Sequence, residues 1–348
     1  MQWTDVIGSA MAGQDLDYDA SYWTMDQVMT GELGDARLAS FLTAMSVKGP
    51  TITEIRGLAD AMQDHAEKVQ VPVDVLDIVG TGGDRAHTAN ISTMSSIVLA
   101  AAGVPVVKHG NRASTSASGS ADVMEALGLN LDLTPGRVGQ VFDEVGITFL
   151  FANKFHPSMR FAAGVRRALG FPTVFNILGP LTNPARPRAS AIGCADAGNA
   201  AIMAGVFAQR GAQALVFRGK ERGLDELTTN ETNEVWEVNG GEIDYFEIDP
   251  VKEFDMAPSK LEDLRGGDAE YNADIARRLF DGETGAIRDA VLLNTGAGMV
   301  AYGELPGVRT DDGTFIERLG NGVKLAADTI DSGAAADLLR RWIQATNA

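Results

Sequence analysis

The stretch VDVLDIVGTGGDRAHTANISTMSSIVLAAAGVPVV, residues 73–107, decides the fold. It begins with a short run rich in β-branched residues that ends in glycines, continues into an apolar helical stretch, and closes with a second β-branched run. A strand, a loop, a helix and another strand in this order are typical of a parallel sheet. The sequence therefore predicts that an α/β domain begins at about residue 73.

The same alternation continues along the chain. Further helices are predicted over 120–128, 157–169, 199–209 and 333–346, and further strands over 146–151, 189–195 and 213–219. The segment 233–248 is predicted to form a hairpin that turns at Asn239-Gly240. The run DAVLLN, residues 289–294, is predicted to be one more buried strand.

Residues 1–70 carry a helical pattern instead. Leu38, Phe41, Leu42 and Met45 recur at the spacing of one helix face, and a second helical pattern covers 51–69. The predicted fold class is therefore α/β: a small all-helical N-terminal domain plus a larger α/β domain, whose central, mostly parallel sheet is flanked by helices.

Composition narrows the classes of function. With a net charge of −18, the chain lacks the Lys/Arg excess that a broad nucleic-acid surface requires. No run approaches the roughly 18–20 apolar residues of a membrane span, and the acidic N-terminus does not resemble a signal peptide, so we expect a cytoplasmic protein without a membrane partner. Cys194 is the only cysteine and lies in an apolar run, which indicates a buried thiol. The four histidines lack zinc-site spacing.

The first segment that carries chemistry is the glycine-rich loop, residues 80–90. Gly80, Gly82 and Gly83 follow a strand and let backbone N–H groups approach an anion, while Ser92 and Thr93 open the next helix. The pattern is neither a Walker A loop nor GxGxxG. Taken alone, it is either a phosphate cradle or a tight connection.

A second polar loop, KHGNRASTSASGS (residues 108–120), also follows a strand and precedes a helix. Lys108 and Arg112 supply local positive charge, and the serines and threonine supply hydroxyl donors; the alternative is a solvated loop that caps the helix at Ser120. Because the carboxyl ends of parallel strands meet at one edge of a sheet, both loops are expected to converge on one ligand.

Two further segments contain charged residues that could bind a ligand or a metal. One predicted apolar helix contains three arginines, Arg160, Arg166 and Arg167. An arginine on such a helix either binds a carboxylate or remains solvated. Asp225 and Glu226 lie in GLDEL, directly after a strand, and are either surface acids or oxygen ligands for Mg²⁺.

Together these segments closely resemble the anthranilate phosphoribosyltransferase family. The shared motifs are GTGGD with NIST, KHGNR with SADVMEALG, HPSMR with VRRALG and TVFNILGPLTNP, and GLDEL. The resemblance covers nearly the whole chain. It departs from the family pattern at Ala117, where many members carry Lys or Arg, at Ser114 and Thr115, where Val and Ser are common, and at Asn153, which replaces a frequent proline.

The resemblance implies an Mg²⁺-dependent glycosyltransferase of tryptophan biosynthesis that joins anthranilate to phosphoribosyl diphosphate. It implies a homodimer whose helical dimerisation domain comprises 1–72, rejoined by about 156–184, and a phosphoribosyl diphosphate-binding domain over 73–155 and 185–348. It assigns Mg²⁺ to Ser92, Asp225 and Glu226, and anthranilate to Gly80, Asn111 and Arg166. It assigns the phosphoribosyl diphosphate to Gly80, Gly83, Asp84, Thr88, Asn90, Ile91, Ser92, Thr93, Lys108, His109, Gly110, Asn111, Arg112, Ala113, Ser114, Thr115, Ser116 and Ser120.

The mechanism expected of such a site is positioning and neutralisation of charge. Lys108 is expected to offset the negative charge of the departing diphosphate, and Arg166 and Asn111 to orient the nucleophile; these three are the expected catalytic residues. His109 is either a general base or part of a loop-ordering hydrogen bond.

Three other interpretations of the sequence are possible. A pyrimidine nucleoside phosphorylase would share the fold, but its group resembles KxS and STGG motifs and lacks GLDEL. A non-catalytic binding protein of the same fold would show a basic groove and eroded metal ligands. A type I phosphoribosyltransferase would carry a diphosphate loop with two acids and a threonine after a strand, which DIVGTGGD does not match.

Overall fold

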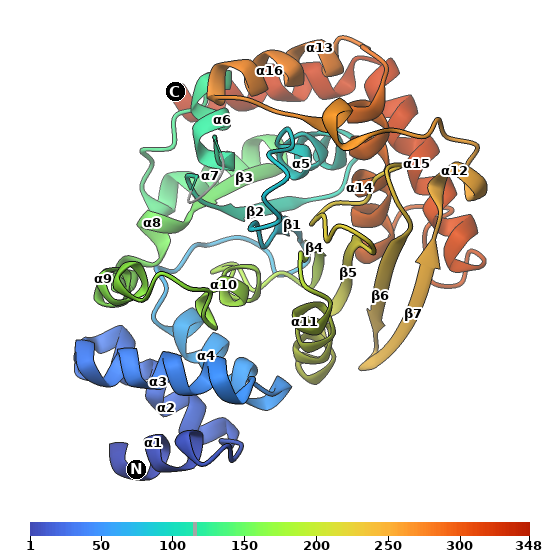
Figure 1. Cartoon of the computed structure of the whole chain (residues 1–348). Coiled ribbons are helices and arrows are strands. Elements are labelled where there is room, and N and C mark those ends of the chain that lie inside the picture. Colours follow the sequence, from blue (N-terminus) through green and yellow to red (C-terminus); the bar gives the residue numbers. More distant parts are fainter. Residues whose placement is uncertain (114–116) are drawn as a thin grey trace. The chain divides into compact units, whose positions relative to one another are not determined.

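The computed structural model describes residues 1–113 and 117–348. The chain divides into two compact units: unit 1 comprises Met1–Lys68 and Ala152–Pro184, and unit 2 comprises Val69–Phe151 and Ala185–Ala348 (Figure 1). Among the described residues, no helix combines the length and the apolar character needed to cross a membrane. The dimerisation predicted for the small domain stays a prediction.

Unit 1 is helical. It contains α1 (Trp3–Met11), α2 (Tyr18–Thr30), α3 (Asp35–Lys48), α4 (Ile52–Asp64), α8 (Ala152–Phe155), α9 (Arg160–Leu169) and α10 (Phe175–Leu178), with 3-10 turns η1 (Pro157–Met159) and η2 (Gly179–Leu181). The predicted apolar face of α3 is confirmed, since its four residues are buried. A capping box starts α4, in which Glu54 N–H donates to Thr51 Oγ1 at 3.3 Å and Thr51 N–H to Glu54 Oε2 at 2.7 Å. This helix ends at Asp64, before the predicted limit of 69.

Unit 2 is built on a seven-stranded sheet with the order β3-β2-β1-β4-β5-β6-β7. Its strands are β1 (Leu76–Gly80), β2 (Val106–Gly110), β3 (Ile147–Phe151), β4 (Ala189–Gly193), β5 (Gln213–Gly219), β6 (Asn233–Asn239) and β7 (Glu242–Ile248). The strands β1 to β5 run parallel, and β6 and β7 are antiparallel. The predicted fold class, with its mostly parallel sheet, is confirmed.

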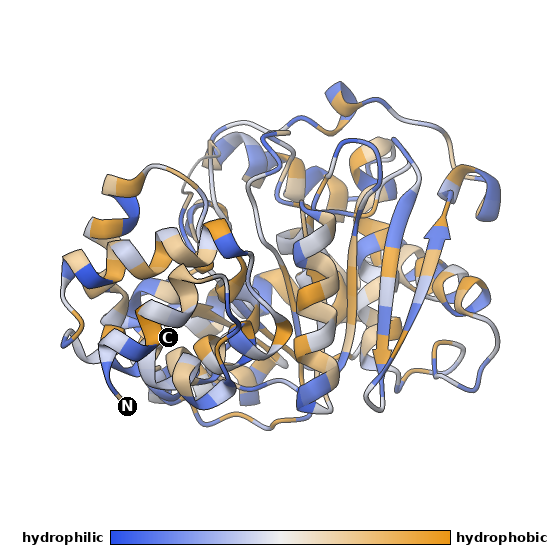
Figure 2. Cartoon of the chain, turned by 60° about the horizontal axis from the view of Figure 1, so that its bottom comes forward, coloured by the Kyte–Doolittle hydropathy of each residue, from blue (hydrophilic) through white to orange (hydrophobic). Residues whose placement is uncertain are grey.

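Helices cover both faces of this sheet. They are α5 (Ile91–Ala101), α6 (Ser120–Leu127), α7 (Pro135–Val145), α11 (Ala197–Arg210), α12 (Pro250–Glu253), η3 (Leu261–Leu264), α13 (Ala269–Phe280), α14 (Ala286–Tyr302), α15 (Phe315–Asp331) and α16 (Ala334–Asn347). The helices α5 and α14 pack on the central strands beneath α15 and α16, whereas α11 packs on β5 and β6 from the other face (Figure 1). In Figure 2 the hydrophobic colour follows the central strands, while the outer hairpin is striped with polar residues.

The strand order explains why helices cover both faces of the sheet, and it indicates at which edge of the sheet a ligand would bind. The chain adds strands outward from β1 to β3, then returns to place β4 on the other side of β1. Because parallel crossovers are right-handed, this reversal puts α5 and α11 on opposite faces. The reversal falls between β1 and β4, and ligands of open α/β sheets bind beyond the carboxyl ends of strands at such a switch point.

Two further local predictions were wrong. DAVLLN lies within α14, because this helix is buried on every side from Ala290 to Tyr302 and so shows no amphipathic period. A short apolar run of this kind does not distinguish a buried strand from a buried helix. The hairpin turns one residue later than predicted, at Gly240-Gly241, whose φ angles of 59° and 88° suit a two-residue turn that requires positive φ at both positions.

Candidate active site

The glycine-rich loop leaves the sheet at the switch point. Gly80 ends β1, and the N–H of Thr81 donates to the carbonyl of Gly193 at the end of β4, at 2.9 Å. Gly82 and Gly83 have φ angles of 67° and 88°, which glycine adopts without strain. The loop thus turns away from the strand ends and leads to the N-terminus of α5, as the sequence predicted.

The loop between β5 and β6 brings Asp225 and Glu226, here called the carboxylate pair, to the same edge. A Cβ on Gly80 would lie 2.3 Å from Asp225 Oδ2, and a Cβ on Gly193 would lie 1.7 Å from the Asp225 carbonyl oxygen. Gly82 N–H donates to Asp225 Oδ2 at 2.7 Å. The carboxylate pair can therefore cross the strand ends only because both strands finish in glycine.

Burial makes the charge of the carboxylate pair costly. Both residues are 8% exposed. Burial, together with the charge of Asp84, raises the pKa of Asp225 to about 7. Burial and the charge of Asp225 raise the pKa of Glu226 well above its usual value, and Lys108 only partly opposes this. A cation at this point would remove a repulsion that the protein alone retains.

Lys108 lies on β2, close enough to Glu226 of the carboxylate pair to feel its charge. It is 1% exposed, and its Nζ donates to the carbonyl of Ile78 and to Ser92 Oγ, the latter at 3.3 Å. Burial lowers the pKa of Lys108 to about 8, against the opposing charges of Asp77 and Glu226. The ammonium group thus remains largely protonated at neutral pH and is held at the N-terminus of α5.

The residues predicted to hold Mg²⁺ are close together and supply suitable donors. Ser92 N–H donates to Glu226 Oε1 at 3.2 Å, and Asp225 adjoins Glu226 in the chain. Two carboxylates and a hydroxyl are the oxygen ligands that Mg²⁺ prefers, usually completed by water and substrate phosphates. Within the described part of the chain, no cluster of three or more His, Cys, Asp or Glu side chains is gathered for a metal. A cation here would therefore depend on the predicted mixed set.

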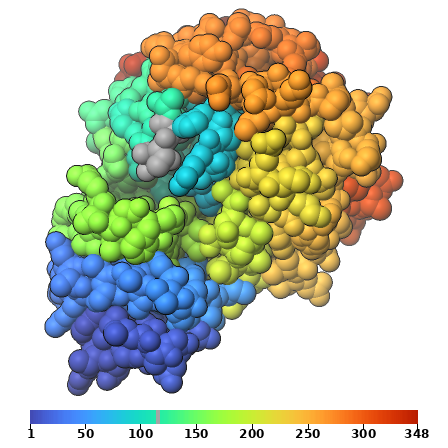
Figure 3. Space-filling view, viewed as in Figure 1, coloured from blue at the N-terminus to red at the C-terminus, as the bar shows by residue number. Residues whose placement is uncertain are grey.

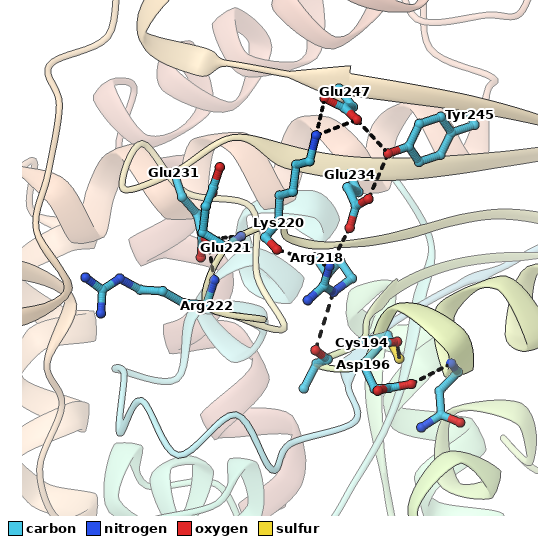
Figure 4. A network of polar contacts seen from close by, with 12 residues as sticks. Cys194, Asp196, Arg218, Lys220, Glu221, Arg222, Glu231, Glu234, Tyr245 and Glu247 are labelled. Atoms are coloured by element: carbon cyan, nitrogen blue, oxygen red, sulfur yellow. Dashed lines mark hydrogen bonds and ion pairs between the residues drawn. The ribbon is translucent and has the colours of Figure 1, made fainter.

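A polar network anchors the base of the loop that carries the carboxylate pair (Figure 4). Arg218 at the end of β5 forms an ion pair with Glu234 on β6. The Tyr245 hydroxyl on β7 lies within hydrogen-bond distance of Glu234, at 2.8 Å, and of Glu247, at 3.0 Å, and Lys220 pairs with Glu247 at 2.7 Å. The pair of Arg218 and Glu234 is mostly buried and fixes the loop more firmly than the exposed lysine pair does.

The 108–120 loop also reaches this edge. The two ends of this segment are joined, since Ser120 Oγ and Ala121 N–H both donate to the Asn111 carbonyl at 3.2 Å. Arg112 pairs with Asp122 at 2.8 Å and Glu125 at 2.6 Å, so its charge is already engaged within the loop and α6. The predicted contacts Ser114, Thr115 and Ser116 lie outside the described residues.

His109 is buried on β2, where its backbone N–H donates to Asp77 Oδ1 at 3.0 Å. This bond belongs to the backbone and leaves the two predicted roles of the ring untested. Asp84 and Thr88 lie in the glycine-rich loop, and Asp84 Oδ1 accepts the N–H of Ala86 at 3.0 Å.

The arginines of α9 belong to unit 1 and differ in burial. Arg166 is partly buried with its guanidinium 5.1 Å from the ring centre of Phe175, and burial lowers its pKa. Arg160 and Arg167 are exposed. Arg166 is therefore the arginine of this helix best suited to a desolvated carboxylate contact, which agrees with its predicted role without testing it.

Sequence reasoning missed several residues that shape the site. Gly193 ends β4 against Asp225, Asn294 on α14 bonds both the N–H and the carbonyl of Leu227, and Asn272 on α13 bonds Asn90. Gly266-Gly267-Asp268 before α13 was a readable sign of a tight approach and a helix cap, and Asp268 does cap α13. Nothing in the sequence showed that this approach is made to the glycine-rich loop.

Comparison with known protein families first shows the class of protein to which the chain belongs. Residues 4–66 match the family described as "Glycosyl transferase family, helical bundle domain", and residues 72–336 match "Glycosyl transferase family, a/b domain". The chain therefore belongs to this glycosyl transferase family.

Relatives that match over nearly the full length show to which branch of this glycosyl transferase family the chain belongs. Anthranilate phosphoribosyltransferases from Rhodococcus jostii (strain RHA1) and from Streptomyces griseus are both 53% identical, over 99% of this chain and over 93% and 96% of their own lengths. A crystal structure of anthranilate phosphoribosyltransferase from Thermus thermophilus has a TM-score of 0.90 at 42% identity and covers 99% of this chain and 100% of that one. The enzyme from Saccharomyces cerevisiae in complex with PRPP and Mg has a TM-score of 0.87 at 26% identity, covering 99% and 98%. The chain belongs to the anthranilate phosphoribosyltransferase family, which confirms the predicted resemblance.

Proposed function

We propose that the chain transfers the phosphoribosyl group of 5-phosphoribosyl 1-diphosphate to the amine of anthranilate, giving N-(5-phosphoribosyl)anthranilate and diphosphate for tryptophan biosynthesis. The observation that carries the proposal is the meeting of the glycine-rich loop, Lys108 and the carboxylate pair at one edge of the sheet, in a chain 53% identical to named enzymes over 99% of its length. The reaction forms a C1–N bond as the C1–O bond to diphosphate breaks, and the amine releases a proton.

The chain's own residues would bind and orient the reactants. The backbone of the glycine-rich loop and the N-terminus of α5 would bind phosphate oxygens, as N–H groups at a helix start do. Lys108 would place a fixed positive charge at the start of α5 while charge develops on the leaving group. The diphosphate contacts are those predicted from the sequence.

Ser92 and the carboxylate pair would hold Mg²⁺, which when bound neutralises diphosphate oxygens. A relative, the enzyme from Saccharomyces cerevisiae, was solved in complex with PRPP and Mg, which supports Mg²⁺ as the metal. Arg166 and Asn111 would orient anthranilate, with the guanidinium on its carboxylate. We also propose, from the family resemblance, that the enzyme is a homodimer and works in the cytoplasm.

The test is a fluorescence assay with anthranilate, phosphoribosyl diphosphate and Mg²⁺, with and without EDTA. The expected result is a loss of anthranilate fluorescence that requires both the diphosphate and the metal. A parallel reaction with thymidine and phosphate tests nucleoside phosphorolysis. No loss of fluorescence by folded enzyme at high concentration would refute the proposal, whichever result the thymidine reaction gives.

A further inference from the structure

Three segments far apart in the sequence meet around one buried amide, the side chain of Asn272 on α13. Asn272 is 3% exposed. Its Oδ1 accepts the N–H of Gly267 at 2.8 Å, and its Nδ2 donates to Asn90 Oδ1 at 2.7 Å and to Ser118 Oγ at 2.9 Å. Because Asn90 precedes α5, Ser118 precedes α6 and Gly267 precedes α13, one side chain ties together the ends of three loops.

The contact extends beyond the amide. Residues 264–267, here called the strap, pair with the second half of the glycine-rich loop: Ala89 N–H donates to the Leu264 carbonyl and Gly266 N–H to the His87 carbonyl, both at 2.9 Å. Thr88 and Arg265 form an antiparallel bridge between them. Figure 3 shows the cyan surface of the glycine-rich loop beside the orange surface to which the strap belongs. The strap therefore follows the loop like a short added strand.

The strap leaves no space against the loop. A Cβ on Gly266 would lie 2.8 Å from the Cα of Ala89 and equally close to Asn272 Oδ1. The amide of Asn90 also donates to the Ser118 carbonyl at 3.3 Å, and Ser118 Oγ donates to the Gly267 carbonyl at 3.2 Å. The polar groups at this junction thus bond one another.

The glycine-rich loop needs such support. Arg85 and His87 have φ angles of 58° and 55°, a left-handed conformation that residues other than glycine adopt uncommonly and at a cost. Strained backbone of this kind persists only where its surroundings hold it, and the His87 carbonyl is bonded to the strap. Loops held in place before the ligand arrives lose less conformational entropy on binding.

We propose that Asn272 is a positioning residue for phosphoribosyl diphosphate. Its amide holds the end of the glycine-rich loop and the residues before α6 in the arrangement that receives the substrate, and it does so through Asn90 and Ser118 rather than by contact with the reacting atoms. The inference rests on the proposed function for its kinetic consequence, while the bracing itself is a property of the chain alone.

The kinetic test compares Asn272→Leu, which retains much of the volume but not the hydrogen bonds, with wild-type enzyme. The KM for phosphoribosyl diphosphate is expected to rise on the order of 10- to 100-fold, since two or three buried hydrogen bonds are lost. The KM for anthranilate and kcat should change less than about twofold. The matched control is Asn130→Ala: Asn130 Oδ1 accepts the N–H of Asp132 at 2.9 Å in the connection between α6 and α7. It should lose stability only. Equal rises in both KM values, or none, would overturn the inference.

Hydrogen exchange without substrates tests the brace independently of the reaction. In Asn272→Leu, amides in 84–93 and in 264–272 should lose protection together, while those of β4 remain protected. In Asn130→Ala, both segments should exchange as in the wild type. Unchanged exchange in Asn272→Leu would overturn the inference even if activity fell. An inactive wild-type enzyme would instead refute the proposed function and leave the exchange result to decide the brace.

Discussion

Replacing Gly193 by alanine should displace the carboxylate pair. The new Cβ would lie 1.7 Å from the carbonyl oxygen of Asp225 and 2.6 Å from its carbonyl carbon. Both are backbone atoms, so no rotation of a side chain relieves the overlap. The end of β4 and the loop must separate by about 1.7 Å to restore a contact of 3.4 Å. Because β4 is paired on both sides within the sheet, the loop is the part that moves.

The size of the effect follows from that displacement. Overpacking of this kind costs roughly 1–3 kcal/mol of the free energy of unfolding. A misplacement of about 1 Å in a catalytic group costs on the order of 100-fold in rate. We therefore expect Gly193→Ala to remain folded, to lose about 100-fold or more in kcat/KM, and to need a higher Mg²⁺ concentration for half-maximal activity.

The assay is steady-state kinetics over a Mg²⁺ titration, with urea unfolding to measure stability. The matched control is Gly136→Ala on α7, where a Cβ would meet nothing within 4 Å and φ is not in the left-handed region. The control should keep wild-type kinetics and gain stability slightly from helix propensity. Wild-type kcat/KM and an unchanged Mg²⁺ midpoint in folded Gly193→Ala would refute the view that this close approach positions the carboxylate pair.

Three further predictions concern single side chains. Arg166→Ala should raise the KM for anthranilate by roughly 10- to 100-fold and leave the KM for phosphoribosyl diphosphate unchanged, whereas the exposed Arg167→Ala should change neither; steady-state kinetics decide. The Cys194 thiol is buried and its pKa is raised to about 11, so iodoacetamide at pH 8 should modify it only after unfolding, and rapid labelling of native protein by mass spectrometry would contradict this. In EDTA, the free energy of unfolding should fall as pH rises from about 4 towards 7, because Asp225 keeps its proton in the folded state up to about pH 7 but only to about 3.8 when unfolded. Urea titrations of Asp225→Asn should show a shallower pH slope, and equal slopes would argue against a buried titrating carboxyl.

The sequence could predict those parts of the fold that depend on local pattern. The alternation of short β-branched runs and helical stretches places the parallel strands, and the four apolar positions of α3 give its buried face. The failure at 289–294 has the same physical origin. Pattern reports which side of an element meets water, and α14 meets almost none, so its sequence carries no period.

The site was predictable only where one segment holds its own chemistry. The glycines from Gly80 to Gly83 predict a turn at which an anion can bind, and the adjacent Asp225 and Glu226 predict oxygen ligands for a metal. The meeting of Gly193 with Asp225, or of Asn272 with Asn90, is set by strand order and by the approach of the strap, across 32 and 182 positions of sequence. A single asparagine in a helix carries no mark of the partner it will find there.

The net charge of the chain explains why positive charge, buried carboxylates and a metal would be combined in one site. A protein of net charge −18 repels an anionic substrate over its surface as a whole, so attraction must be local and protected from solvent. Lys108 and the start of α5 provide it, yet the Ser92 N–H there and the Gly82 N–H in the loop already donate to the carboxylate pair. A diphosphate would compete with these carboxylates for the same donors. A cation bound by the carboxylate pair removes this competition and adds positive charge, so cation and diphosphate must strengthen each other's binding by the same factor. Under the proposed function, the burial that makes the carboxylate pair unfavourable alone would therefore couple the binding of metal to that of substrate.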